Sequence, residues 1–367
     1  MASARPVTFA VVGFGQEAAV RIGGTSYPLE APWPADPYYN GTVEVPADAK
    51  TYNYVIDGKP EPFDRVLGDD VAKTLNEFYG REITYQPMPQ FNSAFSDKNG
   101  AWTRSSRAEI FDGGYIPTVH FSGANAENYI VTAEDATVDV LFVGPTEAVK
   151  YEVHISRRDE NKKELRGRAS VLLTQSAQLK VEFNGEVFYG RSTIKLRNSE
   201  PDATLMREQL YVEMLRAAGA PTIETNKARV YYNKKAYGLL ELQDQANNEG
   251  FIAELFYGNR GQRPDPLGVP LDCSTGADFT PNGPYDAFQQ KNEERSETNS
   301  RVALLSKALA GLDVTSEAAI AEFNKSSFDI DSFFKAMAME YLAGHWDSYC
   351  ECGRWPDRSP PFARGYS

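Results

Sequence analysis

Apolar side chains recur at every second position over short stretches of the first 60 residues. The pattern runs through residues 7–11, 43–45 and 52–56, with Gly, Pro and Asn-Gly breaks between these stretches. Alternate side chains of a strand face opposite sides, so each stretch has one apolar face to bury. Residues 1–60 are therefore predicted to form a small β-sandwich domain. Residues 61–114 are less regular and are predicted to be a connector, with room for one short helix at 69–81.

The two-residue period returns in residues 115–245, which are predicted to form a strand-rich lobe. Alternation at 138–142 and 151–155 predicts two strands, and residues 228–245 predict a hairpin with its turn at Asn233-Lys234-Lys235. His120 and His154 stand alone in this region, without other ligand-type residues spaced around them. They are expected to be solvated or hydrogen-bonded rather than to bind a metal.

The first clear helical pattern follows Asp202, which is a good N-cap residue. Met206, Leu210 and Met214 recur every four residues as an apolar stripe, and Gly219 ends the pattern. Three further apolar residues lie beside this stripe, namely Tyr211, Leu215 and Ala218. This single helix is expected to pack on the strand-rich lobe.

Residues 246–349 are predicted to form a partial helical lobe, and residues 350–367 an unstructured tail. One helix carries Val302, Leu305 and Leu309 on one face, and a last helix begins at Asp329 or Asp331. The predicted fold class is α+β: an N-terminal β-sandwich domain followed by a two-lobed domain, with a strand-rich lobe before a helical one.

Composition excludes some classes of function. The 367 residues carry a formal net charge of −13, which argues against a nucleic-acid partner because phosphate recognition needs clustered Lys and Arg. No run of about 18 apolar residues predicts a membrane span, and the N-terminus lacks the apolar segment of a signal peptide. The common nucleotide-binding, hydrolase and metalloprotease motifs are absent, and no metal-ligating residue is predicted.

Four segments occur in a specific combination and order. They are YIPTVHFSG at 115–123, GRSTIKLRNSEPDATLMREQLYVEMLRAAGAP at 190–221, RVYYNKKAYGLLELQDQ at 229–245 and FDIDSFFKAMAMEYLAGHWDSY at 328–349. Together they resemble the CotH kinase family, which comprises spore coat protein H and its largely fungal relatives. The N-terminal part, with VVGFG and TLNEFYGR, resembles the extra β-domain of fungal members, including the cell-surface invasins of Mucorales.

The resemblance implies an atypical protein-kinase-like fold that transfers the γ-phosphate of ATP to serine of a coat or surface protein, with Mg²⁺ or Mn²⁺ as cofactor. Such a reaction needs a cation on the phosphates, a carboxylate that holds this cation and an aspartate that orients the attacking hydroxyl. On this sequence, Lys195 matches the phosphate-side lysine, Glu208 its partner on the helix and Asp347 the catalytic aspartate. Glu241 falls where the chain crosses between lobes, near an adenine.

Each of these residues has a purely structural alternative. Lys195 fits a solvated strand lysine, and Glu208 fits a surface ion pair with a neighbouring basic residue. Glu241 fits an ordinary exposed residue between lobes, and Asp347 fits a solvated acid at the end of a helix.

Two stretches depart from the family pattern. Thr174, Gln175 and Ser176 stand where lysine is expected, and CECGRWPDRSPPFARGYS after Tyr349 contains neither an asparagine nor a D-F-D-like segment to hold Mg²⁺. We therefore expect a kinase-like domain that is truncated at its C-terminus and inactive in this form, because metal ligands neutralise the triphosphate charge during transfer.

A function of another class fits the same residues. The kinase-like scaffold would then serve adhesion, as in a surface protein that binds a receptor, and the N-terminal domain would contact carbohydrate. Its aromatic side chains offer either stacking faces or core packing; they are Trp33, Tyr38, Tyr39, Tyr52 and Tyr54. The resemblance implies a secreted or cell-surface protein, whereas the missing signal peptide leaves a cytoplasmic location open.

Overall fold

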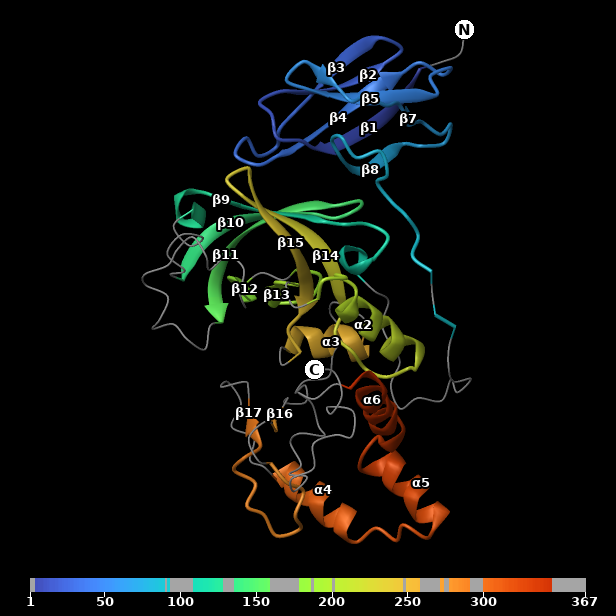
Figure 1. Cartoon of the computed structure of the whole chain (residues 1–367), viewed down its shortest axis with the longest axis vertical. Helices are drawn as coiled ribbons and strands as arrows, with labels where there is room; N and C mark the ends of the chain where they lie inside the picture. The colour runs from blue at the N-terminus through green and yellow to red at the C-terminus, as the bar shows by residue number, and fades with distance from the viewer. Residues whose placement is uncertain are drawn as a thin grey trace, which may run out of the picture. The chain divides into compact units, whose positions relative to one another are not determined.

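The computed structural model describes residues 4–89, 91–92, 108–127, 135–158, 178–185, 188–199, 202–246, 249–257, 271–273, 277–290 and 300–344 (Figure 1). The chain divides into two compact units. The first comprises Met1–Pro89, Arg107–Arg207 and Glu224–Gln245, and the second comprises Gln90–Ser106, Glu208–Ile223 and Ala246–Ser367. Asp347, the departures at 174–176 and the tail at 350–367 lie outside the described residues.

Two sheets at the start of the chain contribute to one apolar core. The first has the order β4-β1-β8, and the second runs β3-β2-β5-β6 with β7 paired to β5. The strands are β1 (Arg5–Val12), β2 (Ala18–Ile22), β3 (Thr25–Leu29), β4 (Tyr38–Val45), β5 (Thr51–Ile56), β6 (Lys59–Pro60), β7 (Arg65–Val66) and β8 (Lys73–Phe78). Phe9, Val43 and Tyr54 lie in the shared core, as the alternating pattern predicts.

The short helix predicted at 69–81 is wrong, because this stretch forms β8. Strand β8 pairs parallel with β1, with Phe78 opposite Val12. Its polar residues are buried because they have fixed partners: the Asn76 side chain donates to Gly144 O at 2.8 Å and accepts from the Tyr38 hydroxyl at 3.0 Å. Hydrogen bonds made at long range in the sequence therefore override the weak local pattern.

The aromatic residues of the N-terminal domain pack inside it. Four tyrosines are at most 4% exposed, namely Tyr38, Tyr39, Tyr52 and Tyr54. Trp33 is half-buried and packs beside Tyr38, with 6.2 Å between the ring centroids. Core packing is thus confirmed for the four tyrosines, and a carbohydrate contact elsewhere on the N-terminal domain stays a prediction.

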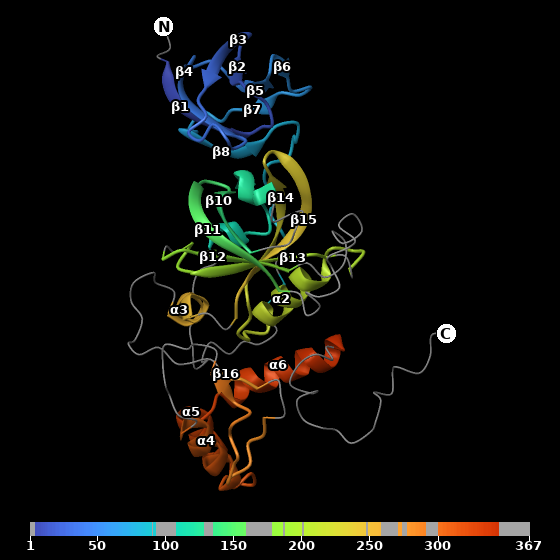
Figure 2. The ribbon, with the colours of Figure 1, turned by 90° about the vertical axis from the view of Figure 1, so that its left-hand side faces the viewer.

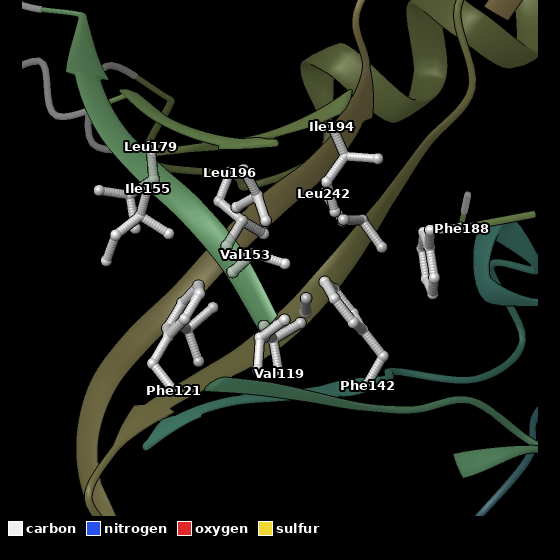
Figure 3. Close-up of a cluster of buried hydrophobic side chains, with 14 of the residues drawn as sticks. Val119, Phe121, Phe142, Val153, Ile155, Leu179, Phe188, Ile194, Leu196 and Leu242 are labelled. Carbon is white, nitrogen blue, oxygen red and sulfur yellow. The ribbon is translucent and has the colours of Figure 1, made fainter. Parts of the chain in front are cut away.

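The strand-rich lobe is a closed barrel. Its strands follow the order β10-β11-β12-β13-β15-β14-β9, and β9 pairs with β10 to close the ring. They are β9 (Thr118–Ser122), β10 (Ala136–Val143), β11 (Ala148–Arg158), β12 (Gln178–Phe183), β13 (Thr193–Arg197), β14 (Thr225–Tyr232) and β15 (Lys235–Asp244). Figure 3 shows Val119, Phe142 and Leu242 pointing into the same buried cluster from β9, β10 and β15. The mixed α+β class is confirmed, whereas the kinase-like two-lobed arrangement and the domain boundaries stay predictions.

The predicted hairpin is β14–β15, and its turn is tighter than expected. Asn233 and Lys234 form the turn with φ of 43° and 63°, and Lys235 already begins β15. Positive φ at both central residues is the geometry that matches the twist of a two-residue hairpin.

The helices of the second unit follow local capping signals. They are α2 (Arg207–Ala217, whose first residue belongs to the first unit), α3 (Glu249–Tyr257), α4 (Ser300–Ala310), α5 (Glu317–Ser326) and α6 (Ile330–Ala343). The remaining short elements are the 3₁₀ turn η1 (Glu109–Phe111) and the strands β16 (Leu271–Asp272) and β17 (Gln289–Gln290). Asp329 caps α6 by accepting from Ser332 N at 3.0 Å, which confirms one of the two predicted caps.

The apolar stripe predicted for α2 is on the exposed side of that helix. Met206, Leu210 and Met214 are 51%, 38% and 40% exposed. The buried cluster instead takes Leu215 from α2 and packs it against Met339 of α6. The apolar residues predicted beside the stripe are thus the ones that become buried, with Leu215 and Ala218 7% and 6% exposed, and the neighbouring helix decides which part of the apolar surface is covered.

Candidate functional site

Strand β13 places Lys195 on the outer face of the barrel. Ile194 and Leu196 are fully buried, and Lys195 between them is half-buried on the opposite face. Lys195 lies opposite Lys180 of β12 and opposite Gln243 of β15. One step along the same face, Arg197 lies opposite Glu241, which in turn lies opposite Lys227 of β14. We call Lys180, Lys195, Arg197 and Lys227 the basic face.

Like charges meet across β12 and β13. Lys180 and Lys195 are directly opposed, an arrangement that is unfavourable unless an anion compensates it. Lys180 Nζ lies 2.5 Å from Glu182 Oε1 on its own strand. The basic face therefore places four cations at positions that the sheet fixes, and two of them, Lys180 and Lys227, already form ion pairs with carboxylates.

Glu241 is 1% exposed, so the prediction of an ordinary exposed residue at this position is wrong. Its carboxylate forms an ion pair with Lys227 and accepts from the Ser199 hydroxyl at 3.3 Å and the Thr225 hydroxyl at 3.4 Å. These contacts make Glu241 the acidic partner of the basic face. A place near an adenine stays a prediction for this residue.

A buried Arg191–Asp244 pair holds the end of β15, and the sequence patterns did not identify it. Asp244 is 1% exposed, pairs with Arg191 and accepts from Glu224 N at 2.9 Å. Burial raises the pKa of Asp244, and the Arg191 charge opposes that rise. The Arg191 guanidinium also lies over the Phe111 ring, 5.0 Å from its centroid. Arg191 and Asp244 lie inside two of the family segments, but alternation alone does not distinguish them from exposed charges.

Glu208 is the second residue of α2 and is half-buried. Asp202 is not the N-cap residue itself, because α2 begins five residues later at Arg207, but its carboxylate accepts from Met206 N at 2.8 Å and from Arg207 N at 2.7 Å, at the start of the helix. Lys195 belongs to the first compact unit and Glu208 to the second, so their pairing stays a prediction.

Asp347 lies beyond the last described residue of its segment. Helix α6 ends at Ala343, and Gly344 caps it with φ of +62°. The predicted catalytic aspartate therefore follows a helix terminus by three residues, and its role stays a prediction.

His120 is hydrogen-bonded and buried, as expected of a histidine that is not a metal ligand. Its Nδ1 lies 2.6 Å from Asp36 Oδ1, and its Nε2 accepts from Lys234 N at 2.8 Å. Because Nε2 accepts a hydrogen bond from a backbone N–H, the ring proton is on Nδ1, and Nδ1–H donates a hydrogen bond to Asp36. Across the described ranges, no group of three His, Cys, Asp or Glu side chains has the geometry of a metal site.

The comparisons with known proteins agree with the motif order. A family model described as CotH kinase protein matches residues 164–355, just over half of the chain. Spore coat protein homolog 1 of Rhizopus delemar is 31% identical over 90% of this chain and 53% of its own length. Invasin CotH3 of the same organism is 33% identical over 90% of this chain and 55% of its own, and Invasin CotH7 is 30% identical over 94% and 57%. The chain spans about half the length of these relatives. It belongs to the CotH family.

Proposed function

We propose that this chain is a CotH-type protein kinase domain that binds ATP with Mg²⁺ or Mn²⁺ on the basic face. The substrate would be a serine of a coat or surface protein. The observation that carries the proposal is the position of Lys195 among cations on adjacent strands, inside the region that the family model matches. All four residues predicted from the family resemblance fall between residues 164 and 355.

The donor set of the basic face suits a nucleotide phosphate chain. Lys195 and Lys180 would take non-bridging oxygens, and Arg197 adds a planar donor next to them. Glu241 holds Lys227 in place by forming an ion pair with it. Bound ATP with its metal ion would supply the phosphoryl group, and Asp347 would orient the serine hydroxyl.

Nucleotide binding can be measured by calorimetry with Mg-ATP. Lys195→Met should weaken binding by about tenfold or more, because a charge-assisted contact is worth about 1.5–3 kcal/mol. Lys50→Met removes an exposed charge elsewhere on the first unit and should leave the affinity unchanged. Equal affinities for the wild type and Lys195→Met would contradict the nucleotide site.

Phosphoryl transfer is a separate step with its own requirement. Residues 350–367 contain neither an asparagine nor a D-F-D-like run, so we expect the 367-residue chain to transfer phosphate to serine slowly or not at all. The assay follows label from γ-labelled ATP into the chain and into a serine-containing acceptor. Incorporation that Asp347→Ala abolishes and Asp357→Ala leaves intact would contradict this expectation and identify an active kinase.

The second candidate is a non-catalytic surface or adhesion protein that uses the same scaffold for binding. It is supported by the similarity to proteins named invasins and spore coat homologues, which also favours a surface or coat location. No helix among the described residues is long and apolar enough to cross a membrane. If adhesion is the function, Lys195→Met and Asp347→Ala should retain wild-type binding of the labelled chain to intact cells. Loss of that binding in both variants would exclude a purely passive scaffold.

A further inference from the structure

A pocket of about 660 Å³ lies within the first unit. Its walls come from the loop that follows β8, from Ile116 and from the β14–β15 hairpin. Figure 2 shows β8 and this hairpin within the first unit. The volume is in the range that holds a small organic ligand. None of the four basic-face residues lines it.

Two arginines line this pocket without an acidic partner. The Arg229 guanidinium lies over the Phe78 ring, 4.6 Å from its centroid, and its Nη1 donates to Ile116 O at 2.6 Å. Among the described residues, no carboxylate forms an ion pair with Arg229 or Arg81. Burial lowers the pKa of Arg229, and the positive charge of Arg81 lowers it further, so the two guanidinium groups are close enough to repel.

The remaining walls are apolar and aromatic. Tyr231 is half-buried and its ring centroid lies 4.4 Å from that of Phe14, while Ile83 and Leu239 are 67% and 40% exposed. Burial raises the pKa of the Tyr231 hydroxyl, so this group remains a neutral donor between the arginines and the apolar walls. Glu82 lines the pocket too, and no ion pair joins it to either arginine in the described part of the chain.

We propose that this pocket binds a small oxyanion, a carboxylate or a phosphate, that is attached to an aromatic or aliphatic body. Arg229 and Arg81 hold the anion, and the walls at Ile83, Tyr231 and Leu239 cover the apolar part. The chain has a net charge of −13, yet Arg229 and Arg81 form no ion pair with a carboxylate of the described residues. A bound anion would neutralise the positive charges of these two arginines. Glu82 at the same pocket repels the anion and limits how much negative charge the ligand can carry.

The experiment is calorimetric titration of the full chain with three probes of one shape: phenyl phosphate, benzoate and the neutral phenol. Phenyl phosphate tests a phosphate as the anionic group and benzoate tests a carboxylate. Phenol has no negative charge and therefore tests binding to the apolar walls alone. We expect saturable binding of at least one anion and binding of phenol that is weaker by about tenfold or more.

The variants separate the site from the fold. Arg229→Met should abolish anion binding, and Arg81→Met, whose side chain is exposed, should weaken it by about tenfold without affecting folding. Glu82→Gln should strengthen it, and Lys325→Met, an exposed charge in the second unit, should leave it unchanged. The proposal is overturned if neither anion binds, if phenol binds as tightly as the anions, or if Arg81→Met retains wild-type affinity.

Discussion

Carboxylates are buried both inside the sandwich and at its junction with the barrel, but the ratio of carboxylates to their nitrogen partners is opposite in the two places. Inside the sandwich, Glu61 and Glu77 share one arginine: Arg65 binds both Glu61 oxygens, at 2.7 and 2.9 Å, and one Glu77 oxygen at 3.1 Å. At the junction, the single carboxylate of Asp36 has two partners, His120 at 2.6 Å and Lys150 at 2.9 Å.

The number of partners determines the direction of the pKa shift. Burial raises the pKa of Glu77, and the Arg65 charge and two tyrosine hydroxyls do not offset it. Burial also acts to raise the pKa of Asp36, but the hydrogen bonds from His120 and Lys150 and the charge of Lys150 outweigh it and hold that pKa below its ordinary value. Two buried carboxylates therefore have pKa shifts of opposite direction, according to whether donors or acceptors are in excess around them.

Arg65→Met should have the largest effect. It leaves two carboxylates buried without a cation, which costs about 3–5 kcal/mol in the free energy of unfolding. Denaturant unfolding of the variant measures this loss, with Arg207→Met as an exposed control that should change little. A loss below about 1 kcal/mol would mean that Glu61 and Glu77 reach water when Arg65 is removed.

Asp36→Asn should cost less, about 2 kcal/mol, because an amide can still accept from His120 while the charged contact to Lys150 is lost. The same unfolding experiment measures it. If the junction contributes to the stability of the whole first unit, the loss should appear in the main unfolding transition. A variant as stable as the wild type would show that the junction adds nothing to the fold.

The pH dependence of stability should distinguish the two settings by sign. The folded pKa of Glu77 is raised, so its contribution is full below the unfolded value and is lost as pH rises through the folded pKa. The folded pKa of Asp36 is lowered, so its contribution is present above the unfolded value and is lost as pH falls through the folded pKa. We expect Glu77→Gln to reduce the loss of stability as pH rises, and Asp36→Asn to reduce the loss of stability as pH falls. The free energy of unfolding of both variants, measured across pH 3–8, tests this. A change on the same side of the pH profile in both variants would refute the comparison.

Asp139→Asn should have the smallest effect, below about 1 kcal/mol. Asp139 lies 3.1 Å from the same Lys150, but its side chain is 50% exposed, whereas that of Asp36 is fully buried. The two asparagine variants thus differ mainly in burial. A loss equal to that of Asp36→Asn would show that Lys150 and not burial controls the junction.

The sequence predicted the elements whose signals are local. The alternation of Val7, Phe9 and Val11 corresponds to β1, the turn at Asn233 corresponds to a real hairpin, and Asp329 caps a real helix. These features depend on side-chain period, backbone dihedral preference and hydrogen bonds within a few residues. The two-residue period of a strand also accounts for Lys195, whose neighbours Ile194 and Leu196 on β13 are buried on the opposite face.

Partners that are far apart in sequence could not be predicted in this way. His120 and Asp36 are separated by 84 positions, and Arg191 and Asp244 by 53. A lone charged or polar residue has the same local pattern whether it ends in water or opposite a buried partner. For that reason the structural alternative for Glu241 places it at the surface, although it is buried, and the local pattern does not identify the Arg191–Asp244 pair.

By itself, the sequence indicated the strands and helices whose signals are local, and the order of its motifs indicated the CotH family. Only the tertiary structure decided the closure of the barrel, the strand at 73–78, the buried side of α2 and the pocket at Arg229. Period and capping are properties of one segment, whereas burial and charge compensation depend on what another segment brings to the same place. The surroundings of each buried charge, and hence the direction of its pKa shift, are therefore known only once the chain is folded.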